Sequence, residues 1–416
     1  AGLAANPLLV IPTATVPTVA DLNVNAGTFD LNGNTQAVRR LTQTTLNTYA
    51  NGAGTVTNSS TSAATLLIVQ DNTATTFSGA ITGGSVNFEK QGSNNLTLLS
   101  ASNLGTGVLT VRGGAVILRD SATITTTGAV SVPFGQITLD NSGIGIVSGS
   151  RIGNGALSLT GGTLSFLAGQ VSDTQTLGAL TINGGANVID NKLNASATNT
   201  GSSSVLTLAS LTRGSAVQST VNFTSAGGNL GGPVGGVVNA SNTQMLNAGA
   251  NPQVVFTAAP ANTNGIIGGW AVINGADFAN YRSTVDPVTG AYGVGNLGFS
   301  YNGQNPFGAY SSNAITAGVA TDNISTGANA GDITSRTVNS WAYRNAGNTS
   351  GTANEIKMRS LDQLVSIGTG GLLINNGSAA VNFLNGRMTA GTAANSSMYV
   401  FANTAAQFLN RFENNG

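Results

Sequence analysis

A ten-residue pattern that recurs along the chain restricts its possible folds more than any other feature. Apolar residues occupy the first, third and tenth positions of the pattern, and glycine occupies the sixth. Six windows match it: LNVNAGTFDL from Leu22, LTVRGGAVIL from Leu109, VSVPFGQITL from Val130, LSLTGGTLSF from Leu157, LTINGGANVI from Leu180 and LLINNGSAAV from Leu372. Because alternating apolar residues are typical of half-buried strands, each window predicts a strand, a tight glycine turn and a second strand.

The spacing of neighbouring windows matches one coil of a parallel β-helix. Val130 begins its window 21 residues after Leu109, and Leu157 begins the next one 27 residues later. Repeats of this kind bury their apolar faces only by stacking on one another. Glycine at the sixth position permits φ > 0 at a corner. We therefore expect an all-β chain that forms a right-handed parallel β-helix, or solenoid, with a loop-rich or side-lobe interruption.

Two other architectures are consistent with parts of the sequence. Short, evenly spaced strands also build antiparallel sandwiches and barrels, and Asn-Gly pairs such as Asn32-Gly33 and Asn274-Gly275 suit their hairpin turns. Several of these pairs lie in or beside a repeat window, so we interpret them as coil corners. Disorder is the second alternative, because Gly and Ser are abundant and aromatic residues are few. Against disorder, 40% of the residues are hydrophobic, in short alternating runs.

The repeat windows and the glycine- and proline-rich breaks divide the chain into four segments. Residues 1–20 form an extended N-terminal arm, and residues 21–226 form a β-solenoid. Residues 227–310 form a loop-rich or side-lobe segment, since Gly and Pro cluster in it. Residues 311–416 continue the solenoid and end close to the last recognisable strands.

Composition excludes several classes of chemistry. Only 7% of the residues are charged, and 15 basic residues balance 15 acidic ones. Nucleic-acid binding relies on clustered Lys and Arg, so we expect no nucleic-acid partner. The chain has no cysteine and no histidine, which excludes disulfides, thiolate or imidazole metal sites and nucleophiles activated by histidine.

The setting predicted from the sequence is outside a bacterial cell. Absence of cysteine is typical of a protein exported through an oxidising compartment. No stretch reaches the roughly 18 to 20 apolar residues of a membrane span, so we expect none. The first residues lack a charged segment followed by an apolar core, and Ala1 is interpreted as a processed end.

One stretch of the chain resembles the autotransporter-associated β-strand repeat of bacterial secreted and surface proteins. It comprises FSGAI from Phe77, VNFEKQGSNNLTLL from Val86 and ASNLGTGVLTVRGGAVIL from Ala101. The positions that match the family pattern are Lys90, Gly92, Leu96, Leu98, Asn103, Gly105, Gly107, Val111 and Gly114. The aromatic residue often found in the Asn turn is missing. The resemblance implies an exported parallel β-helix, mostly adhesin-like or of unknown function, with no shared catalytic residues.

A search for catalytic groups finds scattered carboxylates and no motif. Asp120, Asp140 and Asp190 each follow a predicted strand, and stacked coils place equivalent positions about 4.8 Å apart. We interpret them as corner residues that make Asx turns. Calcium-binding Gly-Gly-x-Gly-x-Asp repeats are absent. We therefore predict no catalytic, cofactor-binding or metal-binding residues and no enzymatic activity, and a carbohydrate-active β-helix enzyme remains the alternative.

The two ends of the chain and one aromatic group are the candidate interaction sites. The proline-rich arm predicts either strand addition to a neighbouring subunit or a cap on its own solenoid. At the other end, we expect the solenoid either to continue in a longer protein or to stack on another molecule. The candidate assembly residues are Leu8, Leu9, Val10, Ile11, Val16, Trp270, Tyr281, Tyr399, Phe401 and Phe408.

These features predict an extracellular structural protein. We expect a subunit of a surface fibre, filament or stalk-like matrix that self-associates by end-to-end stacking or strand addition. A cell-attached adhesin of the autotransporter type, with surface glycans or other cell-surface proteins as partners, is the alternative. Exposed aromatic side chains such as Trp270 suit either function, because they stack on sugars and anchor protein interfaces.

Overall fold

The computed structural model describes residues 10–11, 18–43, 54–70, 73–170, 172–194, 203–214, 218–232, 251–300, 304–345, 353–377, 379–391 and 396–413. These residues form strands, turns and loops. Among them there is no helix that is long and apolar enough to cross a membrane. The chain divides into two compact units. Unit 1 comprises residues 1–219, 225–229 and 233–259, and unit 2 comprises residues 220–224, 230–232 and 260–416.

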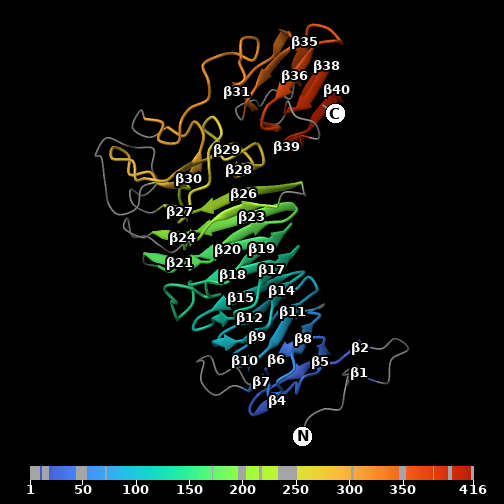
Figure 1. Cartoon of the computed structure of the whole chain (residues 1–416), viewed down its shortest axis with the longest axis vertical. Helices are drawn as coiled ribbons and strands as arrows, with labels where there is room; N and C mark the ends of the chain where they lie inside the picture. The colour runs from blue at the N-terminus through green and yellow to red at the C-terminus, as the bar shows by residue number, and fades with distance from the viewer. Residues whose placement is uncertain are drawn as a thin grey trace. The chain divides into compact units, whose positions relative to one another are not determined.

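In unit 1 the chain passes through three sheets in turn on each coil, which Figure 1 shows from blue to green. The first contains β9 (Thr75–Phe77), β12 (Leu96–Leu98), β15 (Ala115–Arg119), β18 (Gln136–Asp140), β20 (Thr163–Leu167) and β23 (Gly185–Lys192), and β3 (Leu22–Asn23) and β6 (Leu41–Thr42) pair separately. The second contains β4 (Thr28–Asp30), β7 (Thr55–Asn58), β10 (Ala80–Gly83), β13 (Ser102–Asn103) and β16 (Ile124–Thr125), and β21 (Asp173–Leu177), β24 (Ser204–Leu208) and β27 (Pro252–Phe256) form a separate three-stranded sheet. The third contains β5 (Thr35–Val38), β8 (Ala64–Ile68), β11 (Val86–Lys90), β14 (Leu109–Val111), β17 (Val130–Pro133), β19 (Leu157–Thr160), β22 (Leu180–Ile182) and β25 (Leu211–Arg213).

The strand pairing of these sheets confirms the predicted β-solenoid class. Leu109 pairs in parallel with Val130, and Val130 pairs in parallel with Leu157, so the first residues of three repeat windows stack on one another. An antiparallel sandwich or barrel is therefore not the main architecture. Inward residues alternate with outward ones along each strand. Leu66 pairs with Phe88 and both are buried, whereas the residues that flank each of them in its strand are only half-buried. Each such side chain contributes roughly 1.5–3 kcal/mol by leaving water.

The glycine of the repeat serves two different purposes. Gly114 and Gly185 have φ values of 56° and 66°, as predicted for a corner. Gly162 does not have a positive φ. Instead, a Cβ added to it would lie 2.1 Å from the carbonyl oxygen of Val132 on the coil below. The sixth position therefore demands glycine either for its backbone conformation or for close stacking of coils, and only the first reason was predicted.

Residues 141–156 form an insertion between β18 and β19 that is anchored by a buried arginine. Arg151 donates from Nε to Asn141 Oδ1 (2.6 Å), from Nη1 to the Ala122 carbonyl (2.6 Å) and from Nη2 to the Asp120 carbonyl (2.9 Å). Burial lowers the pKa of Arg151 to about 10, which leaves the guanidinium charged at neutral pH. The insertion is thus fixed to the coil below it.

Unit 2 contains an antiparallel lobe and a second set of stacked coils. In the lobe, β29 (Asp277–Arg282) pairs with β28 (Ala271–Ile273) and with β30 (Gly293–Asn296), and β28 also pairs in parallel with β26 (Ser219–Ala226). Asn274-Gly275 therefore lies in a hairpin turn, the role that such pairs have in antiparallel folds. The coils contain β31 (Asn323–Thr326), β34 (Ser340–Asn345), β37 (Gly371–Asn376) and β39 (Tyr399–Ala402) in one parallel sheet, and β32 (Ala330–Ile333), β35 (Asn354–Met358), β38 (Val381–Ala390), β36 (Leu364–Ile367) and β33 (Arg336–Val338) in another, with β40 (Ala406–Glu413) on β38.

The described part of the N-terminal arm folds back on itself. Val10 of β1 (Val10–Ile11) pairs with Val19 of β2 (Thr18–Val19) in an antiparallel, two-stranded sheet. Within the described residues, these strands pair only with each other. Leu8, Leu9 and Val16 lie outside the described residues, as do the side chains of Val10 and Ile11.

Candidate functional site

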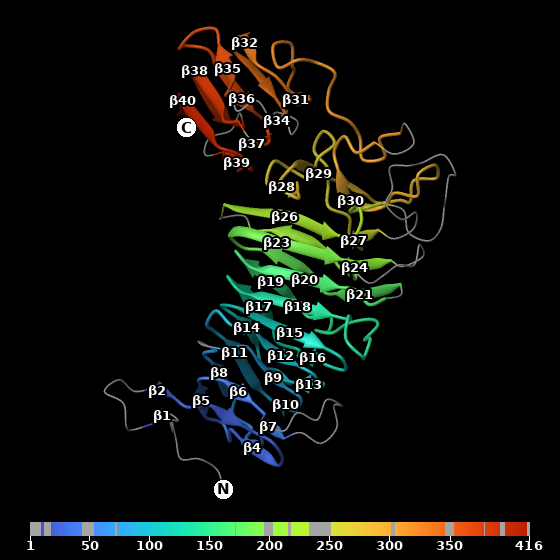
Figure 2. The same ribbon diagram turned by 180° about the vertical axis from the view of Figure 1, so that it is seen from behind.

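The last coil of unit 2, formed by β39 and β40, is the strongest candidate site. β39 pairs with β37, and β40 pairs in parallel with β38 from Val381–Ala406 to Thr389–Glu413. No other strand of the described residues pairs with the opposite edges of β39 and β40, which carry the red end of the colour scale in Figure 2. An edge of this kind offers a row of N–H and C=O groups to a further strand. We call these two strands the terminal rung.

A column of aromatic rings runs from the core of unit 2 to the terminal rung. The rings of Trp341 and Phe383, both buried, meet edge to face with centroids 5.6 Å apart. Phe383 stacks on Phe408 at 4.9 Å and 15°, and Phe408 contacts Phe412 at 5.1 Å. Phe408 is only half-buried, because no further coil of the described residues lies over it. The column therefore ends at a ring that can take one more neighbour.

The terminal rung also exposes apolar side chains. Val400, Leu409 and Phe412 are exposed to 43%, 59% and 47%. They are three of the ten large apolar side chains that are exposed among the described residues. Isolated exposed apolar residues are ordinary, but these three share one strand layer with the open end of the aromatic column. Their concentration at an unpaired edge is typical of an association surface.

One amide of the terminal rung lacks hydrogen bonds. The Nδ2 and Oδ1 atoms of Asn410 are covered and have no partner in the described residues. On the coil below, Asn385 donates from Nδ2 to the Met358 carbonyl at 3.3 Å. An uncompensated buried amide costs about 1–3 kcal/mol. The terminal rung therefore holds a hydrogen-bonding requirement that the described residues do not meet.

The charged residues of the terminal rung are paired within the rung and with the coil below. Glu413 accepts from Arg387 at 3.1 Å, and Arg411 Nε lies 3.8 Å from Glu413. Exposed pairs contribute only about 0–1 kcal/mol each. The rung therefore adds no net charge that would repel a neighbour of the same kind.

The structure places the predicted assembly residues in different environments. Tyr399, Phe401 and Phe408 lie in the terminal rung, where Tyr399 is buried and Phe401 packs against the core of the lobe. Tyr281 lies inside the lobe with 5% of its surface exposed, so it offers no platform to a partner, and Trp270 is half-buried. Sequence reasoning missed Val400, Leu409, Phe412 and Asn410. The alternation of AQFLNRFE from Ala406 was the available signal.

The three aspartates predicted at corners are held in hydrogen bonds. Asp140 accepts from the Ser142 amide at 2.8 Å, which confirms an Asx turn. Asp120 accepts from the Ile144 amide at 2.7 Å, and Asp190 accepts from Ser165 Oγ at 2.9 Å, so both bridge neighbouring coils. Asp190 lies inside β23, so its prediction as a corner residue was wrong. Within the described residues, no three His, Cys, Asp or Glu side chains gather to hold a metal ion.

A buried polar cluster joins the lobe to the coils within unit 2. Asp277 Oδ1 accepts from the Tyr310 hydroxyl at 3.1 Å and lies 3.2 Å from Arg344 Nε. Burial raises the pKa of Asp277, and the opposing Arg344 charge only limits that rise. Burial also raises the pKa of Tyr310. With a single carboxylate tied to an arginine, the cluster matches an anchor for β29 better than an acid/base pair.

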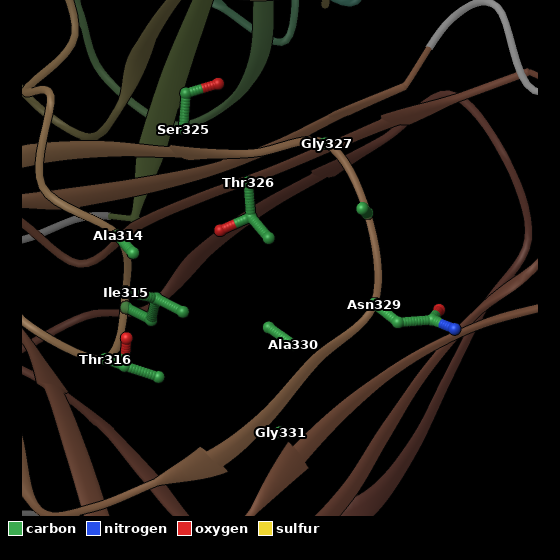
Figure 3. Close-up of a pocket in the computed structure, with 10 residues that line it drawn as sticks. Ala314, Ile315, Thr316, Ser325, Thr326, Gly327, Asn329, Ala330 and Gly331 are labelled. Atoms are coloured by element: carbon green, nitrogen blue, oxygen red, sulfur yellow. The ribbon is translucent and has the colours of Figure 1, made fainter.

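Figure 3 shows a pocket beneath the first coil of unit 2, between Ala314–Thr316 and the turn after β31. Its volume is about 410 Å³. Thr316, Ser325, Thr326 and Asn329 supply its polar side chains, and Ala and Gly residues supply much of the rest. No titratable side chain lines it. The pocket therefore lacks the groups that acid/base catalysis needs.

The described residues form a β-solenoid in which none of them adds a further strand to the last described coil. In comparisons with known proteins, no family model, no curated protein and no solved structure matches this chain.

Proposed function

We propose that this chain is a structural β-solenoid subunit of an extracellular bacterial surface fibre, and that its terminal rung is an assembly surface. The observation that carries the proposal is the conjunction at β39 and β40 of an unpaired edge, exposed Leu409 and Phe412, and an aromatic column that ends at Phe408. Each feature is stabilised when another strand layer is added.

Several features support a passive structural role outside the cell. The surface is built from small polar residues, since 7% of the chain is charged, and no cysteine is available for oxidation. Asp120 and Asp190 form hydrogen bonds to neighbouring coils and so stabilise the stack. The resemblance of residues from Phe77 onward to the autotransporter-associated repeat supports the exported setting.

The test compares two matched lysine substitutions in the whole chain. Leu409→Lys places a charge on the terminal rung, where lysine opposes edge pairing. Leu361→Lys changes an even more exposed leucine, 75% against 59%, in the turn between β35 and β36. We expect the native chain and Leu361→Lys to form oligomers or rods by light scattering and negative-stain microscopy, and Leu409→Lys to stay monomeric. Equal assembly of the two variants, or a monomeric native chain at every concentration, would contradict the proposal.

A further inference from the structure

The first coil of unit 1 has the features that complement the terminal rung. β3, β4 and β5 each end the order of their sheets, and no strand of the described residues pairs with their outer edges. Phe29 of β4 pairs in register with Val56, which is fully buried, so Phe29 faces the core. Phe29 is itself only half-buried. The first coil therefore ends in a half-covered phenylalanine, as the terminal rung does at Phe408.

The first coil also holds an incompletely bonded amide on its inner side. Gln36 of β5 is 2% exposed and donates from Nε2 to the Ala37 carbonyl at 3.0 Å. Its Oε1 atom is covered and has no partner in the described residues. At the terminal rung, both amide atoms of Asn410 are covered and have no partner in the described residues. Each end therefore holds an amide with an unmet hydrogen bond.

The order of the strands makes the two ends compatible as consecutive coils. β38 spans two positions of a coil, because its first part pairs with β35 and its second part with β36. β40 pairs along β38 and spans the same two positions. Three strand segments of the terminal rung therefore match the three strands of the first coil in order. β39 corresponds to β3, the first half of β40 to β4, and the second half of β40 to β5. Phe29 then lies over Phe408, and Gln36 is the second residue of the strand that follows the corner near Asn410.

Side-chain hydrogen bonds hold the two ends of the first coil together within the single chain. Asp21 accepts from Arg39 Nε at 2.9 Å and from Arg40 Nε at 3.0 Å. These bonds join the residue before β3 to the two residues after β5. A preorganised edge loses less conformational freedom when it binds.

We infer that the terminal rung of one copy binds the first coil of a second copy in a head-to-tail contact. In this contact β4 pairs with Ala406–Leu409, and β5 pairs with the second half of β40. This inference rests on the proposed function and names the partner surface. Because the two surfaces differ, the contact is heterologous and repeats without closing unless the rotation forms a ring. Repetition of this contact gives a filament in which Phe29 of one copy extends the column of Trp341, Phe383 and Phe408 of the next.

The absence of cysteine from the native chain permits a direct test. Thr28→Cys and Gln407→Cys replace exposed residues that precede Phe29 and Phe408. Strands in a sheet lie about 4.8 Å apart, within the Cα separations that a disulfide spans. We expect oxidation of an equal mixture of the two proteins to give a covalent dimer on a non-reducing gel, and oxidation of either protein alone to give none. Thr28→Cys mixed with Leu361→Cys is the matched control and should give none.

Four other outcomes separate this inference from the proposed function. A dimer from Gln407→Cys alone means tail-to-tail pairing, which overturns the inference and leaves self-assembly intact. Equal dimer in the Leu361→Cys control means random collision and overturns it as well. Oligomers in light scattering without any cross-link mean that another segment, such as the N-terminal arm, occupies the rung. Monomers in light scattering overturn both proposals.

Discussion

Lys90 Nζ donates to the carbonyl oxygen of Gly113, which lies 23 residues further along the chain, at 2.9 Å. The same ammonium donates to the carbonyls of Gln91 (2.7 Å) and Gly92 (3.2 Å). Lys90 is fully buried and so fastens the corner of one coil to the corner of the next. A lysine inside a solenoid is costly unless its donors are satisfied, and here all three are.

Replacing Lys90 by methionine should weaken the stack. Lys90→Met keeps the volume of the side chain but leaves carbonyls at two corners without this donor, so we expect a loss of about 1–3 kcal/mol in the free energy of unfolding. Lys192→Met is the control, because Lys192 forms a partly exposed ion pair with Asp190 that contributes at most about 1 kcal/mol. Urea unfolding at pH 7 measures both. Equal losses in the two variants would show that Lys90 has no special role.

Stability should also depend on pH through Lys90. Burial lowers its pKa to about 8, below the ordinary value of 10.5, so its charged form is less stable in the folded chain than in the unfolded chain. That penalty is complete below about pH 8 and disappears as the pH rises towards 10.5. We expect the unfolding midpoint of the native chain to rise over this range relative to that of Lys90→Met. Parallel curves for the two proteins would contradict the assigned cause.

At low pH the first coil should lose its anchor at Asp21. Hydrogen bonds from Arg40 and Arg39 lower the pKa of Asp21 to about 2 from 3.8. The ionised carboxylate therefore stabilises the fold above about pH 4, and this contribution is lost as the pH falls to 2. After solvent screening we expect an effect on the order of 1 kcal/mol. The stability difference between the native chain and Asp21→Asn should shrink between pH 4 and pH 2, and a constant difference would be evidence against this ion pair.

Close stacking of coils predicts that substitution by alanine lowers stability at one glycine and is tolerated at another. Gly162→Ala places a methyl group 2.1 Å from the Val132 carbonyl oxygen, so the coils must separate locally. We expect a loss of about 1–3 kcal/mol or more. Gly84→Ala meets no atom within 4 Å and should change stability little. Thermal unfolding followed by circular dichroism compares them, and a neutral Gly162→Ala would mean that the coils are not in such close contact.

The sequence was sufficient to predict the stacked coils of unit 1, and the reason is physical. Each coil places its apolar residues over those of the next, so Leu109, Val130 and Leu157 had to recur at similar intervals. Partners on adjacent coils were harder to identify. Glu89 pairs with Arg112, and Arg119 lies 3.8 Å from Asp140, so these charged residues meet their partners on a neighbouring coil. Register across coils decides those contacts, and local sequence does not contain it.

The candidate site was only partly predictable for a related reason. Phe408 was identified as an aromatic residue near the end, but Leu409 and Asn410 become conspicuous only when β40 is known to lie on β38 without a strand beyond it. Tyr281 shows the opposite limitation, because its burial depends on an antiparallel lobe for which no repeat window exists. Exposure is a property of the neighbours that a segment acquires in the fold.

The insertion anchored by Arg151 shows that the strands of this fold must recur in register, whereas the corners between them can vary in length. Val130 and Leu157 remain paired although the intervening coil is longer than the previous one, since the additional residues leave the stack at a corner. Ile144 at that corner is 74% exposed, while Arg151 holds the base of the loop against the coil below. Corners of this kind are where evolution or an engineer can lengthen the chain without altering its stacked strands.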